Sequence, residues 1–258
     1  MAAPGSQSLV VGGILRFGEV LAGRDPDRLN PILTDNEAAN EFLLSDDWAF
    51  LAGVIGDYQM PAERAWAVPY NLSRRLGGWS VELVADHANR VLEAFLGPPP
   101  LHRFPTQSSR WLVAGAQRVI DEYDGVAGAV WNDQPTARAL QARLNEFLGI
   151  SQKKAAMAVE ILNGQFGVDI RELAGSDIAY DVHVRRVMLR AGLAERDEVN
   201  HMVEAARRAN PARPGALALP MWEIGRTWCH ARRPECTLCV IGGVCPRRVG
   251  AAANVRGA

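Results

Sequence analysis

The four cysteines of this chain lie in one short stretch near its C-terminal end, and this stretch constrains the fold more than any other feature. Cys229, Cys236, Cys239 and Cys245 are separated by six, two and five residues. Because no cysteine is left elsewhere, we expect the four thiols to share one site. Thiolates bind metal ions and iron–sulfur clusters, and four on one compact loop can each supply one corner of a tetrahedron.

The spacing favours a [4Fe–4S] cluster over two alternatives. A structural zinc site typically has two short Cys-x2-4-Cys knuckles, whereas only Cys236 and Cys239 are that close here. Two disulfides stay open as well, but nothing else in the sequence suggests a secreted chain. We therefore expect these cysteines to hold a [4Fe–4S] cluster.

Composition and the N-terminal sequence indicate an ordinary globular protein. The 258 residues suffice for one large domain or two small ones, with 48% hydrophobic and 22% charged residues. Residues 1–7 lack the basic, apolar and small-residue order of a signal peptide, and the apolar run 9–15 is too short to span a bilayer. We expect a cytoplasmic protein without a membrane segment.

Positive charge is concentrated in two places, although the formal net charge of −1 does not suggest a nucleic-acid binder. Between Arg226 and Arg248 there are five arginines and one acid, Glu235, a local excess of +4. A second basic group is formed by Arg185, Arg186 and Arg190. A solvated surface is the usual reading of such charge, but two clusters favour phosphate contact.

The chain holds only two lysines, and they are adjacent, Lys153 and Lys154. Arginine stands at every other basic position. Lysine can lose its proton and become a nucleophile, whereas arginine stays charged. The pair therefore indicates either an amine needed for chemistry or chance placement on a helix surface.

The hydrophobic periodicity is helical nearly throughout and predicts an all-α fold. Helices are expected over 8–21, 38–44, 48–55, 61–76, 80–96, 109–123, 136–147 and 152–162. Pro98 to Pro100 and the glycines 77 and 78 interrupt the pattern. The last two helices are joined by a short turn with glycine, and residues 148–155 read L-G-I-S-Q-K-K-A. Such a helix-hairpin-helix can point amides at a phosphate, or it can be a plain helix pair.

Four segments together resemble the endonuclease III-like helix-hairpin-helix DNA glycosylases. They are V-I-G-D-Y-Q at 54–59, the hairpin at 148–155, Y-D-V-H-V-R-R-V at 180–187 and the cysteine loop with its preceding G-R at 225–245. The matches follow the family order over most of the chain. The resemblance implies a six-helix barrel over 37–172 with its hairpin at 136–162. It also implies an iron–sulfur cluster domain formed by 1–36 and 173–258, with a cleft between the two parts.

The resemblance also implies roles for individual residues. Lys153 matches the nucleophilic lysine, Asp181 the catalytic aspartate and Gln59 the glutamine that enters the gap left by a flipped nucleotide. Asp181 also fits a helix N-cap. The residues expected to contact DNA are Gln59, Gly149, Ile150, Ser151, Lys154, Arg185, Arg226, Arg232 and Arg233. For Lys154 a second role is open, as a neighbour that lowers the pKa of Lys153.

The implied function is base excision from double-stranded DNA that contains a damaged or mismatched base. Lys153 would form a Schiff base and permit β-elimination at the abasic site. Two alternatives are a monofunctional thymine or uracil mismatch glycosylase in which Asp181 activates water, and a non-catalytic module that binds distorted DNA. We expect a monomer, associated with the nucleoid when it is on DNA.

Several positions depart from the family pattern. Leu148 and Ser151 replace a proline and a glycine of the hairpin, and the 28 residues from Lys153 to Asp181 include an extra loop at 163–179. Asp57 and Tyr58 replace the serine and alanine before the glutamine, which indicates a different base pocket. Gly53 stands where adenine mismatch glycosylases carry a glutamate, which argues against adenine as the excised base.

Overall fold

The structure is a computed structural model that describes residues 4–23 and 33–249. Within these ranges the chain forms helices and no strand, and one parallel bridge joins Thr136 to Arg171. The expected all-α class is confirmed. None of the helices in the described ranges combines the length and the apolar composition that a bilayer span requires.

The helices, three of which are short 3-10 turns (η), have the following bounds. They are α1 (Pro4–Ala22), α2 (Glu37–Ser45), α3 (Asp47–Gly56), α4 (Ala62–Trp66), α5 (Val68–Leu76), α6 (Val81–Asp86), α7 (Ala88–Leu96), α8 (Pro105–Tyr123), η1 (Ala127–Val130), α9 (Ala137–Asn145), α10 (Gln152–Gly164), η2 (Leu173–Gly175), α11 (Val182–Arg190), α12 (Val199–Ala209), η3 (Pro214–Leu217) and α13 (Ala218–Thr227).

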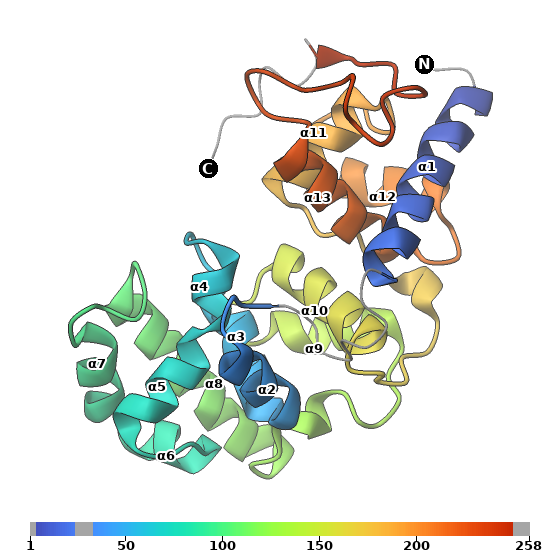
Figure 1. Ribbon diagram of the computed structural model, residues 1–258. Helices are drawn as coiled ribbons and strands as arrows, with labels where there is room; N and C mark the ends of the chain where they lie inside the picture. Colours follow the sequence, from blue (N-terminus) through green and yellow to red (C-terminus); the bar gives the residue numbers. More distant parts are fainter. Residues whose placement is uncertain (1–3, 24–32, 250–258) are drawn as a thin grey trace. The chain divides into compact units, whose positions relative to one another are not determined.

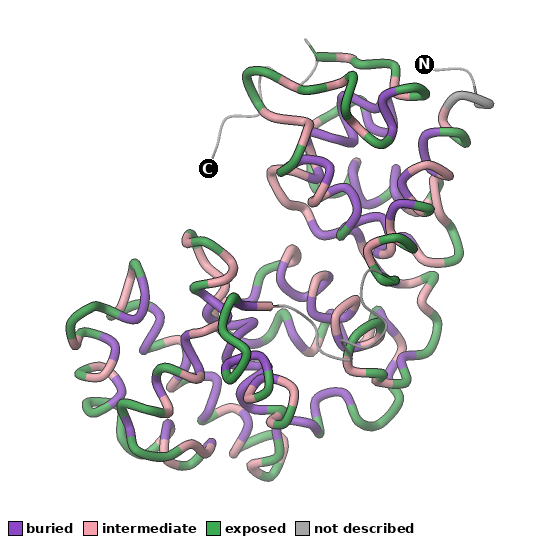
Figure 2. The backbone as a smooth tube through the Cα atoms, viewed as in Figure 1, coloured by how far each residue is buried: buried purple, intermediate pink, exposed green. Residues whose placement is uncertain are grey.

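The described residues divide into two compact units (Figure 1). The first, which we call the loop unit, holds residues 4–23, 136–138 and 171–249, and thus brings α1 to the C-terminal helices. The second, the hairpin unit, holds residues 33–135 and 139–170. Each unit has its own buried residues in the interior (Figure 2).

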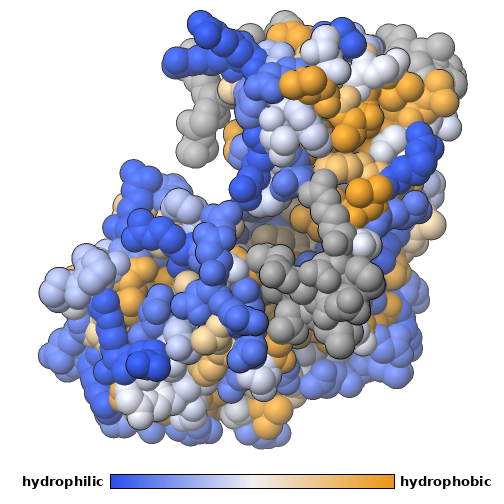
Figure 3. Space-filling view, viewed as in Figure 1, coloured by the Kyte–Doolittle hydropathy of each residue, from blue (hydrophilic) through white to orange (hydrophobic). Residues whose placement is uncertain are grey.

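The core of the hairpin unit is built around α3, in which every residue from Trp48 to Gly56 is buried. This helix packs against α2, α5 and α8. Phe50 lies at its centre, with ring centroids 5.6 Å from Trp66, 5.8 Å from Trp131 and 4.6 Å from Phe166. Burial of one such aromatic side chain contributes about 1.5–3 kcal/mol. The visible surface of this unit is mostly hydrophilic, which suits helices with one face in water (Figure 3).

Short polar residues define where the helices of this core begin. The side chain of Asn36 accepts a hydrogen bond from the Ala39 amide at 3.1 Å, and Asp46 Oδ1 accepts one from the Ala49 amide at 2.6 Å. Each caps an amide that has no acceptor inside its own helix. Both helices extend one residue beyond each end of the ranges 38–44 and 48–55 that the apolar spacing predicts.

Two of the expected helices are divided. The helix predicted over 61–76 ends at Trp66 and restarts at Val68, because Pro69 lacks an amide proton and its ring crowds the carbonyl four residues earlier. The helix predicted over 80–96 is interrupted at His87, whose ψ of 47° is not helical. Both segments were expected to be continuous, since their apolar spacing alone carries no sign of the breaks.

In the loop unit, α13 packs against both α11 and α1. Val10 and Ile14 of α1 are completely buried, as are Met188 of α11 and Met221 of α13. The cysteine loop follows α13 directly. The N-terminal helix therefore supports the scaffold of this loop, although the two are distant in the sequence.

Candidate functional site

The hairpin turn between α9 and α10 depends on one glycine. Gly149 has a φ of +90°, and the Ile150 amide donates to the Phe147 carbonyl at 3.0 Å to close the turn. A Cβ atom on Gly149 would lie 2.7 Å from the ring of Trp111. Glycine is therefore needed both for the backbone conformation and for the close packing of the turn.

The geometry of the turn differs between the residues that were expected to contact phosphate. Ser151 is exposed and is the N-cap of α10, where the positive end of the helix dipole lies. Ile150 is buried and its amide is used inside the turn. The expectation that Ile150 contacts DNA therefore needs correction, because neither its side chain nor its amide faces outward.

Lys153 lies in the first turn of α10 with its amine near the surface. Its side chain is 35% exposed, and its Nζ is 3.6 Å from Oδ2 of Asp57, whose side chain is only 10% exposed. Asp57 follows the last residue of α3, and its amide caps that helix by donating to the Gly53 carbonyl at 3.0 Å. The structure thus holds an accessible amine beside a nearly buried carboxylate.

Lys154 has a different environment from its neighbour. The residue is 3% exposed, and its Nζ donates to the Ile55 carbonyl at 2.8 Å. The amine also lies 5.9 Å from the ring centroid of Tyr58 and 5.6 Å from that of Trp111, which are cation–π distances. The prediction that Lys154 contacts DNA phosphate is wrong for this conformation, because the amine points into the hairpin unit.

Burial also changes the acidity of Lys154. Its pKa is lowered to about 8, mainly by desolvation; the negative charge of Asp57 opposes the shift and the positive charge of Lys153 adds to it. The amine is therefore charged on most molecules at neutral pH, but far less strongly so than an ordinary lysine.

Gln59, the predicted wedge, is exposed and has a φ of +45°. Its Nε2 donates to the Tyr58 hydroxyl at 3.1 Å. A left-handed conformation is uncommon for glutamine, and such residues are concentrated at functional loops. Tyr58 contacts Phe104 and Trp111, with ring centroids at 5.6 Å and 5.1 Å, and all three rings are partly exposed. Two of these rings, Tyr58 and Trp111, are the ones that the Lys154 amine contacts.

Asp181 is the N-cap of α11, which is one of the roles expected from the sequence. Its Oδ1 accepts a hydrogen bond from the His183 amide at 2.8 Å. The residue is only partly buried. Asp181 belongs to the loop unit, whereas Lys153 and Gln59 belong to the hairpin unit.

The arginines expected to contact DNA have different environments. Arg185 donates through Nε to Asp197 Oδ1 at 2.7 Å and its guanidinium lies over the Tyr180 ring, so this side chain is largely used within the loop unit. Arg226 is exposed and lies 4.3 Å from the ring centroid of Trp222. Arg232 and Arg233 are both exposed on the cysteine loop. Arg232 and Arg233 thus lie on the exposed surface of the cysteine loop.

Arg186 and Arg190 are buried, which the charge pattern did not indicate. Arg186 donates to the carbonyls of Cys229 and Gly225 at 2.6 and 2.9 Å. Arg190 donates to the carbonyls of His230 and Ala231 at 2.7 and 2.8 Å, and its Nη1 is 3.5 Å from Cys229 Sγ. Both side chains hold the start of the cysteine loop, so the expected basic group does not form a phosphate-binding surface.

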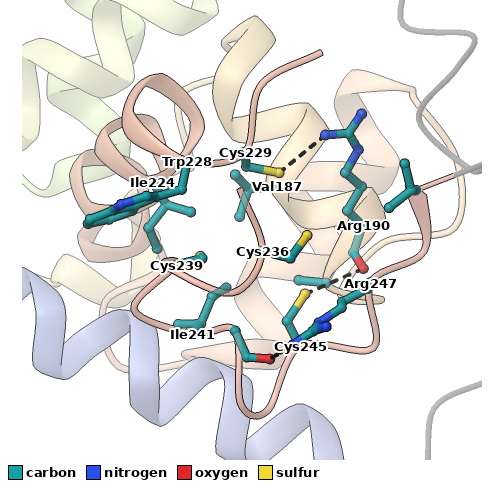
Figure 4. Close-up of a pocket in the computed structure, with 13 residues that line it drawn as sticks. Val187, Arg190, Ile224, Trp228, Cys229, Cys236, Cys239, Ile241, Cys245 and Arg247 are labelled. Carbon is teal, nitrogen blue, oxygen red and sulfur yellow. Dashed lines mark hydrogen bonds between the residues drawn. The ribbon is translucent and has the colours of Figure 1, made fainter. Parts of the chain in front are cut away.

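The four cysteines line one pocket of the loop unit (Figure 4). All four are free thiols, which excludes disulfides in this structure. Val187, Ile224 and Ile241 form much of the apolar wall. Burial raises the pKa of the Cys239 and Cys245 thiols, and the charges of the other cysteines raise it further. Mutually repelling thiolates in one apolar pocket are the surroundings that a cationic metal centre relieves.

The described residues contain no group of three or more His, Cys, Asp or Glu side chains that could hold a single metal ion. The four cysteines nevertheless line one common pocket. A cubane cluster binds each thiolate at a different iron, and therefore needs sulfurs that stand farther apart than a single zinc ion does.

Comparison with solved structures shows which known proteins share this fold. A trapped covalent intermediate of endonuclease III with DNA matches with a TM-score of 0.64 and 19% identity, over 95% of this chain and 99% of that chain. A thermostable thymine-DNA glycosylase matches with a TM-score of 0.63 and 17% identity, over 95% and 97%. The 8-oxoguanine DNA glycosylase of Thermotoga maritima gives 0.51 and 17%, over 83% and 93%.

No family profile and no curated protein sequence matches the chain. The likeness is therefore one of three-dimensional structure, and it extends over nearly the full length of endonuclease III. The fold implied by the four sequence segments is confirmed. The chain has the fold of the endonuclease III-like helix-hairpin-helix DNA glycosylases.

Proposed function

We propose that the protein is a base-excision DNA glycosylase with lyase activity at abasic sites, and that Lys153 is its nucleophile. The observation that carries the proposal is the partly exposed side chain of Lys153 in the first turn of the second hairpin helix. This position lies in a fold shared with an endonuclease III that was trapped covalently on DNA.

The chemistry would follow from the properties of an amine. A base inside a duplex is out of reach, so it must be turned out of the stack at a cost of a few kcal/mol. The neutral amine of Lys153 then attacks C1′ of the sugar while the glycosidic bond breaks and its electron pair leaves with the base. The Schiff base that forms permits β-elimination and cleavage of the strand.

Other residues would bind and orient the DNA. The exposed N-terminus of α10 at Ser151 suits a phosphate, as do Arg226, Arg232 and Arg233. Gln59, exposed on a strained loop, is our candidate for the side chain that fills the gap in the duplex. We assign Asp181 to the stabilisation of positive charge on the sugar, in addition to its capping role.

We further propose that Cys229, Cys236, Cys239 and Cys245 hold a [4Fe–4S] cluster, which makes the loop unit an iron–sulfur cluster domain. The four free thiols around one apolar pocket support this assignment, and their spacing in the sequence favours it over zinc. When bound, the cluster would tie the loop together and so fix Arg232 and Arg233, without a part in bond breaking.

The partner is then double-stranded DNA with a damaged or mismatched base, which the protein would bind as a monomer in the cytoplasm or on the nucleoid. The likeness to a thymine-DNA glycosylase keeps a second candidate open, a monofunctional mismatch glycosylase in which Asp181 activates water.

The test is incubation of the full chain with duplexes that carry one lesion each, with and without borohydride. The duplexes contain thymine glycol, 8-oxoguanine, uracil or thymine opposite guanine, or a bare abasic site. We expect a borohydride-trapped adduct that disappears in Lys153→Gln and in Lys153→Arg, which keeps the charge but lacks a nucleophilic amine. An adduct should still form in Lys154→Gln.

The same experiment separates the alternatives. Base release without an adduct would favour the monofunctional enzyme, and its loss in Asp181→Asn would support the role of that residue. Tight binding to a lesion duplex with neither base release nor adduct would refute the enzyme and favour a DNA-binding module.

A further inference from the structure

Three charged side chains converge where α3 ends and α10 begins. The Asp57 carboxylate is 3.6 Å from Lys153 Nζ, and its charge also acts on the buried amine of Lys154. One nearly buried carboxylate thus serves two adjacent lysines, and these are the only lysines of the chain. All three residues belong to the hairpin unit, so their arrangement lies inside one compact body.

Lys154 contacts the end of α3, the helix that Asp57 follows. Its ammonium donates to the carbonyl of Ile55, in the last turn of α3. The carbonyls of a last helical turn have no acceptor role inside the helix, and a cation there also complements the helix dipole. The faces of Tyr58 and Trp111 are within cation–π distance of the amine, which strengthens the contact at a site that excludes water.

His102 also faces this turn but adds no positive charge. Its Nδ1 accepts from the Phe104 amide at 2.9 Å, so its proton lies on Nε2, which is 3.2 Å from the Gly56 carbonyl. Burial lowers the pKa of His102 as well. The charges that act on the Lys154 amine are those of Asp57 and Lys153.

We propose that Asp57 is a positioning residue for the amine of Lys153, and that the buried Lys154 fixes the turn that carries Asp57. The proposal rests on Lys153 being the reactive amine of the proposed function. A carboxylate at this distance restricts the orientations of the long Lys153 side chain, and so reduces the entropy lost when its amine is brought to a reacting atom.

The first experiment measures the reactivity of each lysine in the full chain, without DNA. A trace of acetic anhydride is added and acetylation is quantified by mass spectrometry, which can resolve two lysines directly. Anhydride reacts with neutral amines, and Asp57 favours the charged form of its partner. We expect Asp57→Asn to speed acetylation of Lys153 by roughly threefold or more, the effect of a partly screened ion pair.

A matched control is Asp133→Asn, which removes another carboxylate of the hairpin unit. Asp133 pairs with Arg143, with a shortest contact of 2.7 Å. This variant should leave acetylation of Lys153 at the wild-type rate. Equal rates in wild type, Asp133→Asn and folded Asp57→Asn would overturn the proposal.

The role of Lys154 is tested by a double-mutant cycle. In a Lys154→Met background the turn is no longer fixed, so Asp57→Asn should change Lys153 acetylation much less than it does in the wild type. An undiminished effect would overturn this part. If Lys154→Met does not fold, the comparison of Asp57→Asn with Asp133→Asn still decides the role of Asp57.

The second readout is adduct formation on an abasic duplex. Asp57→Asn should lower the rate of trapping at saturating DNA by roughly tenfold or more, because a poorly positioned nucleophile reacts more slowly. The affinity for DNA should stay unchanged. A loss of affinity with an unchanged rate would contradict positioning. If the wild type forms no adduct on any duplex, the proposed function fails, whereas the acetylation result stands by itself.

Discussion

Lys153 and Lys154 are adjacent in the chain but have opposite environments. Lys153 follows the helix surface and keeps a partly exposed amine, while Lys154 is rotated by about 100° and enters the core between α3 and α8. A buried ammonium is tolerated because a helix-end carbonyl and two aromatic faces replace water. Part of the desolvation cost nevertheless remains, as the lowered pKa of Lys154 shows.

This cost predicts a specific dependence of stability on pH. Between about pH 8 and the ordinary lysine value of 10.5, the unfolded chain holds a proton on Lys154 that the folded chain has lost. The contribution of Lys154 to the free energy of unfolding therefore rises with pH across this window, by about 3 kcal/mol in all. Urea unfolding at several pH values should show a rise in wild type that Lys154→Met lacks.

The matched variant for this measurement is Lys153→Met. Its amine is partly exposed, so its removal should leave most of the rise in place. Identical pH profiles in wild type and Lys154→Met would contradict a strongly shifted pKa for the buried amine.

At the scale of elements, the hairpin turn is a tightly packed connection of the candidate site. Its glycine has a positive φ and lies against a tryptophan ring at the same time. The turn places α10 so that Lys154 meets the end of α3 and Lys153 meets Asp57. A substitution that shifts the backbone at Gly149 should therefore displace both lysines.

Gly149→Ala should destabilise the protein far more than Gly77→Ala. Both glycines have a positive φ, which costs an alanine about 1–2 kcal/mol. A Cβ at Gly77 meets nothing within 4 Å, whereas at Gly149 it would be 2.7 Å from the Trp111 ring. We expect an extra loss of about 1–3 kcal/mol for Gly149→Ala from overpacking. Equal losses in urea unfolding would show that the ring moves aside freely.

At the scale of the whole molecule, the N-terminal helix joins the C-terminal helices in the loop unit, and the chain between them forms the hairpin unit. The loop unit ends in a segment that has little regular structure and surrounds four thiols. Such a segment gains most of its order from what it binds, because metal binding is coupled to folding.

The cluster assignment predicts the metal content and the effect of its removal. Protein purified without oxygen should contain iron and acid-labile sulfide in equal amounts, and Cys236→Ser should lose both and have a lower Tm. Thr237→Ser, an exposed change in the same loop, should keep both. Zinc with no sulfide in the wild type would establish the alternative site instead.

The sequence by itself determined the helical class, the approximate positions of α2 and α3, the glycine turn of the hairpin and the grouping of the cysteines. These features follow from local backbone preference, from the spacing of apolar residues and from the positions of the cysteines along the chain. It did not reveal the break at His87, because the helical spacing continues through that residue.

Only the tertiary structure decided which charged side chains are buried. Lys154 meets a carbonyl 99 residues away, and Arg190 meets carbonyls that follow it by 40 and 41 residues. In the sequence both look like surface charges. Whether a charge is buried depends on the acceptors that distant segments bring to it, and a local pattern carries no information about those acceptors.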